Sequence, residues 1–213
     1  MEYALSHREA LFRLVLEHLQ LTLLALGFAL VFGIGLTLLL WRFPRLQQVS
    51  VYLLSVLYAV PSFAFFALLI PLTGLGQTTT VIVLTLYAQY ILVRSFLSGL
   101  IEIDSALLEA GRGMGMTEGQ LLVAVQLPLA VPALFAGIKL AATSIIAMAT
   151  IGATINAGGL GTLLFDGLRT ASLTKLIWGI GLTVSLSGLF SLLIDFLEDL
   201  ATPKQSSLSE KEN

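Results

Sequence analysis

One polar stretch, residues 102–127, separates two long apolar runs and holds the side chains best suited to recognition. Asp104 can cap a short helix at its start, and Thr117 and Gln120 have the spacing of a capping box for a second helix. Between these caps lie glycines at positions 111, 113 and 115, which disfavour one continuous helix. The stretch therefore predicts two short helices joined by a glycine bend.

Side chains that could act in catalysis or hold a metal are few. Glu109 and Arg112 are three residues apart on the first expected helix, where they can pair. The chain has no cysteine, and its two histidines, His7 and His18, lie near the amino end, so neither a disulfide nor a thiolate metal site is possible. The run Gly137-Ile138-Lys139-Leu140 lacks the Ser or Thr of a phosphate loop and lies in an apolar segment. We expect no enzyme activity, no cofactor and no metal bound by this chain.

The composition places most of the chain in a membrane. Hydrophobic residues make up 57% of the sequence, charged residues make up 11%, and the mean hydropathy is +0.95. A soluble domain carries about 25% charged residues because its surface faces water. These values predict an all-α integral membrane protein surrounded by the lipid bilayer. The net charge of −2 and the absence of a basic stretch predict no nucleic-acid partner.

The spacing of charged and turn-forming residues predicts about five membrane spans, because a helix needs about 20 apolar residues to cross the hydrocarbon layer. We expect an amphipathic lead-in over residues 1–17, a transmembrane domain over 18–200 and a disordered cytoplasmic tail over 201–213. The expected spans are 18–41, 49–70, 79–97, 128–151 and 174–194, with the polar loop 102–127 between the third and the fourth.

Arg42 and Arg45, which have no acidic neighbour, favour a cytoplasmic position for the first loop. With five spans, the amino terminus then lies outside, and both the polar loop 102–127 and the carboxyl terminus lie inside.

The polar loop resembles the EAA loop of permease subunits of binding-protein-dependent ABC importers, the MetI-like superfamily. That motif reads Glu-Ala-Ala, three residues, Gly, nine residues and Ile-x-Leu-Pro. This chain has Glu109-Ala110-Gly111, Gly115 and Val125-Gln126-Leu127-Pro128, and it departs from the motif at Gly111 and Val125. The resemblance implies a cytoplasmic coupling helix that docks on separate ATP-binding subunits. The implied coupling residues are Glu109, Ala110, Gly111, Gly115, Leu127 and Pro128.

The resemblance covers roughly residues 16–200 and is strongest to the osmoprotectant branch, which serves glycine betaine, carnitine and choline. Its further matches are His18-Leu19, Val60-Pro61-Ser62 and Ala157-Gly158-Gly159-Leu160-Gly161. It implies a bacterial or archaeal plasma membrane, a second permease copy or paralogue, and an extracytoplasmic substrate-binding protein. ATP is then bound by the partner subunits.

Two alternatives stay open. Methionine-type and other amino-acid permeases share the same core motif. A self-contained secondary transporter would need ionisable residues inside its spans, and by this criterion only Lys139 qualifies. Lys139 itself fits a headgroup or structural polar contact better than a role in the path.

A translocation path is expected where the spans are interrupted. Pro61 should kink the second span, and it lies beside Tyr58 and Ser62. The glycine-rich run 157–161 allows unusual backbone angles and is expected to contact the binding protein. These features give the predicted path residues Tyr58, Pro61, Ser62, Asn156 and Gly159.

Overall fold

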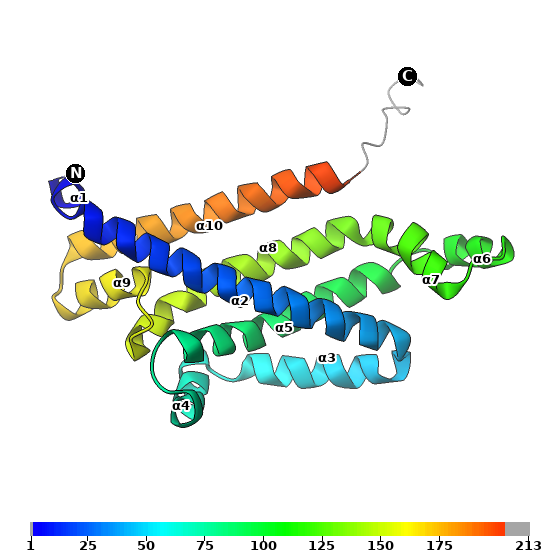
Figure 1. Cartoon of the computed structure of the whole chain (residues 1–213), viewed down its shortest axis with the longest axis horizontal. Helices are drawn as coiled ribbons and strands as arrows, with labels where there is room; N and C mark the ends of the chain where they lie inside the picture. Colours follow the sequence, from blue (N-terminus) through cyan, green and yellow to red (C-terminus); the bar gives the residue numbers. More distant parts are fainter. Residues whose placement is uncertain (1, 203–213) are drawn as a thin grey trace, which may run out of the picture.

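The computed structural model describes residues 2–202, which form helices and their connections, with no strand among these residues (Figure 1). Four helical segments in this range are long and apolar enough to cross a bilayer, and a bent pair of helices makes a fifth. The expected all-α membrane fold is confirmed. In chain order, the helices are α1 (Glu2–Ser6), α2 (Arg8–Arg42), α3 (Pro44–Ala59), α4 (Ser62–Thr73), α5 (Gln77–Ile101), α6 (Ser105–Gly113), α7 (Glu118–Leu121), α8 (Leu127–Gly152), α9 (Leu160–Arg169) and α10 (Leu173–Ala201).

Helix α2 joins two segments that the sequence divided. It runs for 35 residues without a break at residue 17, so the expected lead-in and first span are one helix. At 1.5 Å per residue it is about 52 Å long, more than the roughly 30 Å of the hydrocarbon layer. Its charged first turns therefore extend beyond the membrane at the end of the bundle where the chain begins (Figure 1).

The second expected span is broken rather than kinked. Helices α3 and α4 meet at an angle of 93° around Val60 and Pro61. Proline has no amide hydrogen and disfavours a helical conformation in the residue before it, and Val60 is accordingly extended, with ψ 131°. The hydroxyl of Tyr87 donates a hydrogen bond to the carbonyl oxygen of Val60, which satisfies an acceptor that the break leaves free.

Helix α5 forms the centre of the bundle, between α2 and α8 (Figure 1). The main cluster of buried side chains comes from these three helices and α10, and small residues dominate the α2 and α8 contributions. An added Cβ at Gly137 of α8 would lie 2.6 Å from Cβ of Ser95. Small residues allow this close approach, which drives helix association in lipid.

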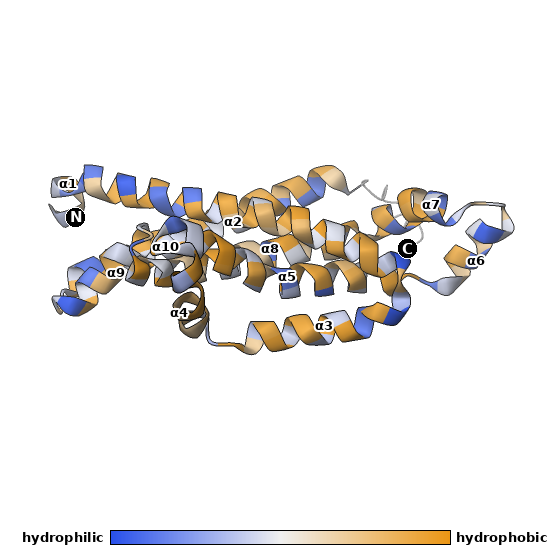
Figure 2. Ribbon diagram, turned by 60° about the horizontal axis from the view of Figure 1, so that its bottom comes forward, coloured by the Kyte–Doolittle hydropathy of each residue, from blue (hydrophilic) through white to orange (hydrophobic). Residues whose placement is uncertain are grey.

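The two ends of the bundle carry different loops. The α2–α3 junction and the α6–α7 pair lie at one end, whereas α1, α9 and α4 lie at the other (Figure 1). Figure 2 shows apolar residues along the length of the bundle and hydrophilic residues concentrated at its ends. Helix α10 continues to Ala201, so the expected tail begins later, and residues 203–213 of that tail lie outside the described range.

Candidate functional site

Helices α6 and α7 are the two short helices that the polar stretch predicted. The Asp104 carboxylate accepts a hydrogen bond from the backbone N–H of Ala106 at 2.9 Å and caps α6. Thr117 and Gln120 form the expected capping box of α7. Residues 114–116 connect the helices, and the pair projects past the ends of the spans (Figure 2).

Two glycines shape this loop for different reasons. A Cβ on Gly111 would lie 2.4 Å from Cδ2 of Leu121, so the Leu121 side chain of α7 would have to move away from α6 if residue 111 were alanine. Gly111 is therefore a departure from the family motif that the packing explains. Gly115 has open space around it but adopts φ +85°, a conformation that other residues rarely take.

An ion pair holds the two helices in register, but its partners differ from the expected ones. Arg112 donates to Glu118 through Nε at 2.8 Å and through a terminal nitrogen at 3.2 Å, and not to Glu109. The Arg112 hydrogen bond lowers the pKa of Glu118, so this carboxylate stays ionised at neutral pH. A helix-to-helix pair across the glycine bend could not be read from spacing within one helix.

Glu109 makes no close ion pair and interacts with Arg112 only through its charge. No cation lies within 4 Å of its carboxylate among residues 2–202, and both Glu109 and Ala110 are exposed. Two apolar side chains beside them, Leu107 and Met114, are 50% and 77% exposed although this loop lies outside the spans. Exposed apolar side chains around an exposed charge are typical of a protein-docking surface.

The second helix of the loop, α7, continues into the fourth span without a break. Residues 118–155 form one helical rod that contains a short π-helix, Leu122–Gln126. Pro128 cannot donate to the carbonyl of Ala124, and the N–H of Leu127 reaches back five residues to Leu122. Pro128 therefore widens a turn instead of starting a new helix, and α7 and α8 belong to one continuous helical segment.

The predicted path residues of the second span lie at the α3–α4 break. Tyr58 is 37% exposed and contacts two tyrosines of α5, with ring centroids 5.8 Å from Tyr87 and 5.1 Å from Tyr90. Pro61 is exposed and Ser62 begins α4. Ile155, next to Asn156, packs in the same apolar cluster as Val60, so the structure brings both predicted groups of path residues into one region.

The glycine-rich loop around residues 157–161 is far more buried than its glycines suggested. Asn156 is exposed with φ +64°, but Ala157, Gly159, Leu160 and Gly161 are buried. In the single chain the surface of this run is therefore limited to Asn156 and the half-buried Gly158, and its contact with a binding protein stays a prediction. Gly159 is buried against His18, and its place in the path stays a prediction.

His18 is the residue that fixes this loop. It is completely buried, its Nε2 lies 3.0 Å from the carbonyl oxygen of Ile146, and its Nδ1 accepts a hydrogen bond from the backbone N–H of Leu160 at 3.3 Å. These partners require the tautomer protonated on Nε2. The neighbouring Glu17 carboxylate accepts a hydrogen bond from the N–H of Gly159 at 3.0 Å. The motif residues His18 and 157–161, distant in sequence, thus form one structural unit.

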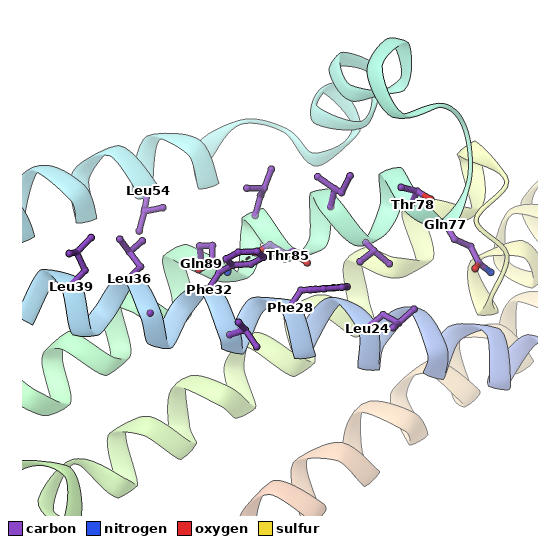
Figure 3. A pocket seen from close by; sticks show the side chains of 15 residues that line it. Leu24, Phe28, Phe32, Leu36, Leu39, Leu54, Gln77, Thr78, Thr85 and Gln89 are labelled. Atoms are coloured by element: carbon purple, nitrogen blue, oxygen red, sulfur yellow. Dashed lines mark hydrogen bonds between the residues drawn. The ribbon is translucent and has the colours of Figure 1, made fainter. Parts of the chain in front are cut away.

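A large groove lies between α2, α3 and α5 (Figure 3). It has a volume of about 1060 Å³, and most of its lining is apolar, including Phe28 and Phe32. Its polar residues Thr85 and Gln89 donate hydrogen bonds to carbonyl oxygens of α2. Gln77 and Thr78 also line the groove, and Oε1 of Gln89 is buried without a hydrogen-bond partner among the described residues, so the groove is mostly apolar but keeps polar groups.

Two cations lie within the helices that form the spans, Lys139 in α8 and Arg94 in α5, and Lys139 makes a structural polar contact of the kind expected. Lys139 pairs with Asp195 of α10 at 2.5 Å, a structural contact that α8 sequence alone could not identify. Arg94 lies within α5, so Lys139 is not the only cation in a span, contrary to the expectation. Arg94 could have been identified from the sequence as a cation in a span, because residue 94 lies inside the third expected span, 79–97.

The comparisons with known proteins agree with this geometry. Residues 28–207 match the family model of the binding-protein-dependent transport system inner membrane component. The chain is 36% identical over 192 residues to the carnitine transport permease protein OpuCB of Listeria monocytogenes, covering 88% of this chain and 86% of the relative. It is 35% identical over 209 residues to the osmoprotectant import permease protein OsmW of Salmonella typhimurium, covering 96% and 97%.

A solved structure of the MetNI methionine ABC transporter in an inward-facing conformation has the same fold. The TM-score is 0.84 at 24% sequence identity, and the match covers 93% of this chain and 99% of the other. Permeases of this kind work with ATP-binding subunits and substrate-binding proteins. The family match over most of the chain, together with the EAA loop on α6 and α7, shows that this multi-pass membrane protein belongs to the family of binding-protein-dependent transport system inner membrane components and is the permease subunit of an ABC importer.

Proposed function

We propose that this permease carries small quaternary-ammonium osmoprotectants, such as carnitine, glycine betaine or choline, into the cell. The observation that carries the proposal is the similarity to osmoprotectant and carnitine permeases at 35–36% identity over nearly the full length of both chains. The methionine transporter is similar at 24% identity, which supports a shared fold and gives no reason to prefer an amino-acid substrate.

The coupling role belongs to α6 and α7. The exposed Glu109, the glycine bend at Gly115 and the continuous rod into α8 support docking of an ATP-binding subunit whose movement tilts the fourth span. Leu127 and Pro128 then lie at the start of α8, where the movement enters the span, and Gly111 allows α7 to pack closely against α6. This role places α6 and α7 in the cytoplasm, the carboxyl terminus on the same side, and the amino terminus outside.

A second permease copy or a paralogue completes the path. Lys139 and Asp195 are 39% and 44% exposed in the single chain although both lie within spans. Charged groups facing lipid are costly, so residues of this kind are found against protein or water. The half-exposed pair supports covering of the α8–α10 face by a partner subunit. The path residues Tyr58, Pro61, Ser62 and Asn156 remain part of the proposal.

Uptake by the reconstituted complex tests the proposed substrate class. The permease, its ATP-binding subunit and its substrate-binding protein are placed in proteoliposomes, and ATP-dependent uptake of labelled glycine betaine, carnitine, choline and methionine is compared. We expect uptake of at least one quaternary ammonium compound and none of methionine. Uptake of methionine alone would refute the proposed substrate class and leave the permease assignment intact.

A further inference from the structure

Arg94 is a cation inside a span without an acidic partner. It lies seven residues before the end of α5, about 10 Å from the inner end of that helix. Its side chain is exposed, and no carboxylate lies within 4 Å of it among residues 2–202. A terminal nitrogen donates to the hydroxyl of Tyr90, and the guanidinium carbon lies 5.7 Å from the centroid of that ring. Most of its five donors therefore remain available.

A hollow lies directly at this guanidinium. Its volume is about 340 Å³, and it is lined by Tyr90, Ile91, Arg94, Ser95, Ser98 and Leu140. This volume falls within the range of small-molecule sites. The Ser95 hydroxyl makes no hydrogen bond within the described part of the chain, whereas Ser98 donates to Glu102. The hollow thus offers a guanidinium without an acidic partner and a hydroxyl without a hydrogen bond among the described residues.

A second aromatic ring, that of Tyr58 on α3, packs against the Tyr90 ring. The ring of Tyr58 is tilted by 35° against the Tyr90 ring, with centroids 5.1 Å apart, and the Tyr58 side chain is partly exposed at the α3–α4 break. The faces of tyrosine rings attract quaternary ammonium groups. The Arg94 guanidinium of α5 and the Tyr58 ring of α3, which lies beside the hollow and does not line it, therefore both contact Tyr90.

We propose that this hollow is a transit site for quaternary ammonium compounds that also carry a carboxylate. Arg94 takes the carboxylate, with Ser95 as a further donor, and the partly exposed Tyr58 ring takes the onium group, because the Tyr90 ring already contacts the Arg94 guanidinium. This inference rests on the proposed function and sharpens it, because choline has the onium group but no carboxylate. Glycine betaine and carnitine have both groups and fit the whole site.

The decisive variant is Arg94→Gln, which removes the charge and keeps a polar side chain of similar length. Hydrogen bonds to charged groups contribute enough that we expect the ratio of glycine betaine uptake to choline uptake to fall about tenfold to a hundredfold. Arg94→Lys keeps the charge but loses the forked geometry, and it should restore part of the ratio. Tyr58→Leu should reduce uptake of both compounds.

Arg45→Gln is the matched control, because Arg45 is an exposed cation at the α2–α3 junction outside the site. Each variant complex is assembled with its partner subunits, checked for intact assembly, and assayed in vesicles of phosphatidylethanolamine and phosphatidylglycerol. This lipid mixture contains no onium headgroup that could occupy the hollow. An arginine that only anchors the helix at lipid phosphates would change uptake of both compounds equally.

The possible results separate the site from the proposed function. A fall of the uptake ratio in Arg94→Gln but not in Arg45→Gln supports the site. An unchanged ratio in Arg94→Gln, or a parent complex that takes up choline alone, overturns the site and leaves the osmoprotectant function standing. A parent complex that takes up none of glycine betaine, carnitine and choline overturns both.

Discussion

The loops at the two ends of the bundle differ in where their contacts are made. The outer loop, residues 152–161, is satisfied within the chain: His18 and Glu17 bond to its backbone, and its glycines are closed over by neighbouring helices. The inner loop, α6 and α7, has its own internal ion pair but presents Glu109, Leu107 and Met114 outward. Buried glycine motifs at one end therefore indicate rigidity within the chain, whereas exposed motif residues at the other end indicate a partner.

This difference predicts that substitutions in the outer loop damage the fold, and the largest effect is expected at Gly161. A Cβ there would lie 1.9 Å from the carbonyl oxygen of Thr150, which is backbone and cannot move aside cheaply. Gly161→Val should lower the free energy of unfolding by about 3 kcal/mol or more. Gly188→Val is the control, because Gly188 has open space around it. Equal thermal unfolding of the two purified variants would contradict the close packing of the outer loop.

Substitutions in the inner loop should damage partner binding instead. Glu109→Lys reverses an exposed, unpaired charge, so we expect an unchanged thermal midpoint and at least a tenfold weaker association with the ATP-binding subunit. Glu9→Lys makes the same charge change at the opposite end of the bundle and should leave association unchanged. Pull-down with purified ATP-binding subunit measures both, and equal binding by the two variants would argue against docking at α6.

His18 tests whether the outer loop is fixed by specific hydrogen bonds. His18→Ala removes two partners of buried backbone groups and should cost about 2–4 kcal/mol of unfolding free energy. His18→Asn retains an acceptor near the position of Nδ1 and should recover part of that loss. Because the chain has only two histidines, nitrogen-15 labelling of histidine can report the tautomer directly. A signal from a His18 ring protonated on Nδ1 would be inconsistent with the structure.

The smallest expected effect concerns the ion pair between Arg112 and Glu118. Because the pKa of Glu118 is lowered in the folded loop, the pair stabilises the loop at neutral pH and is lost as the pH falls through that lowered value. A spin label at position 114 should become more mobile on acidification. In Glu118→Gln the label should already be mobile at neutral pH, with little further change. If the label responded to acid identically in both chains, the Arg112–Glu118 ion pair would not be what orders the loop.

Much of the inner loop could be predicted from the sequence because its signals are local. The Asp104 cap, the Thr117–Gln120 capping box and the glycine bend each depend on residues within a few positions of one another. The spans could be predicted because apolar length is also a local property.

Contacts between distant segments could not be predicted in this way. The Glu109–Arg112 pair was wrong because Glu118, beyond the bend, competes for the same guanidinium. The Lys139–Asp195 pair, the burial of His18 and the 93° break at Pro61 depend on how helices pack in three dimensions. The sequence located the residues of the outer loop but not their burial, because a glycine run is compatible with an open gate and with tight packing.

Site-specific thiol labelling tests the central claim most directly, because the chain contains no cysteine. Cysteine is placed at Ala110 on α6 and, for comparison, at Thr162 on α9, both exposed positions at opposite ends. In intact cells, a membrane-impermeant reagent should label the Thr162→Cys chain and spare the Ala110→Cys chain. After permeabilisation it should label Ala110→Cys, except where the ATP-binding subunit is bound. Labelling of Ala110→Cys from outside intact cells would place the loop on the wrong side of the membrane and contradict its role as the docking surface.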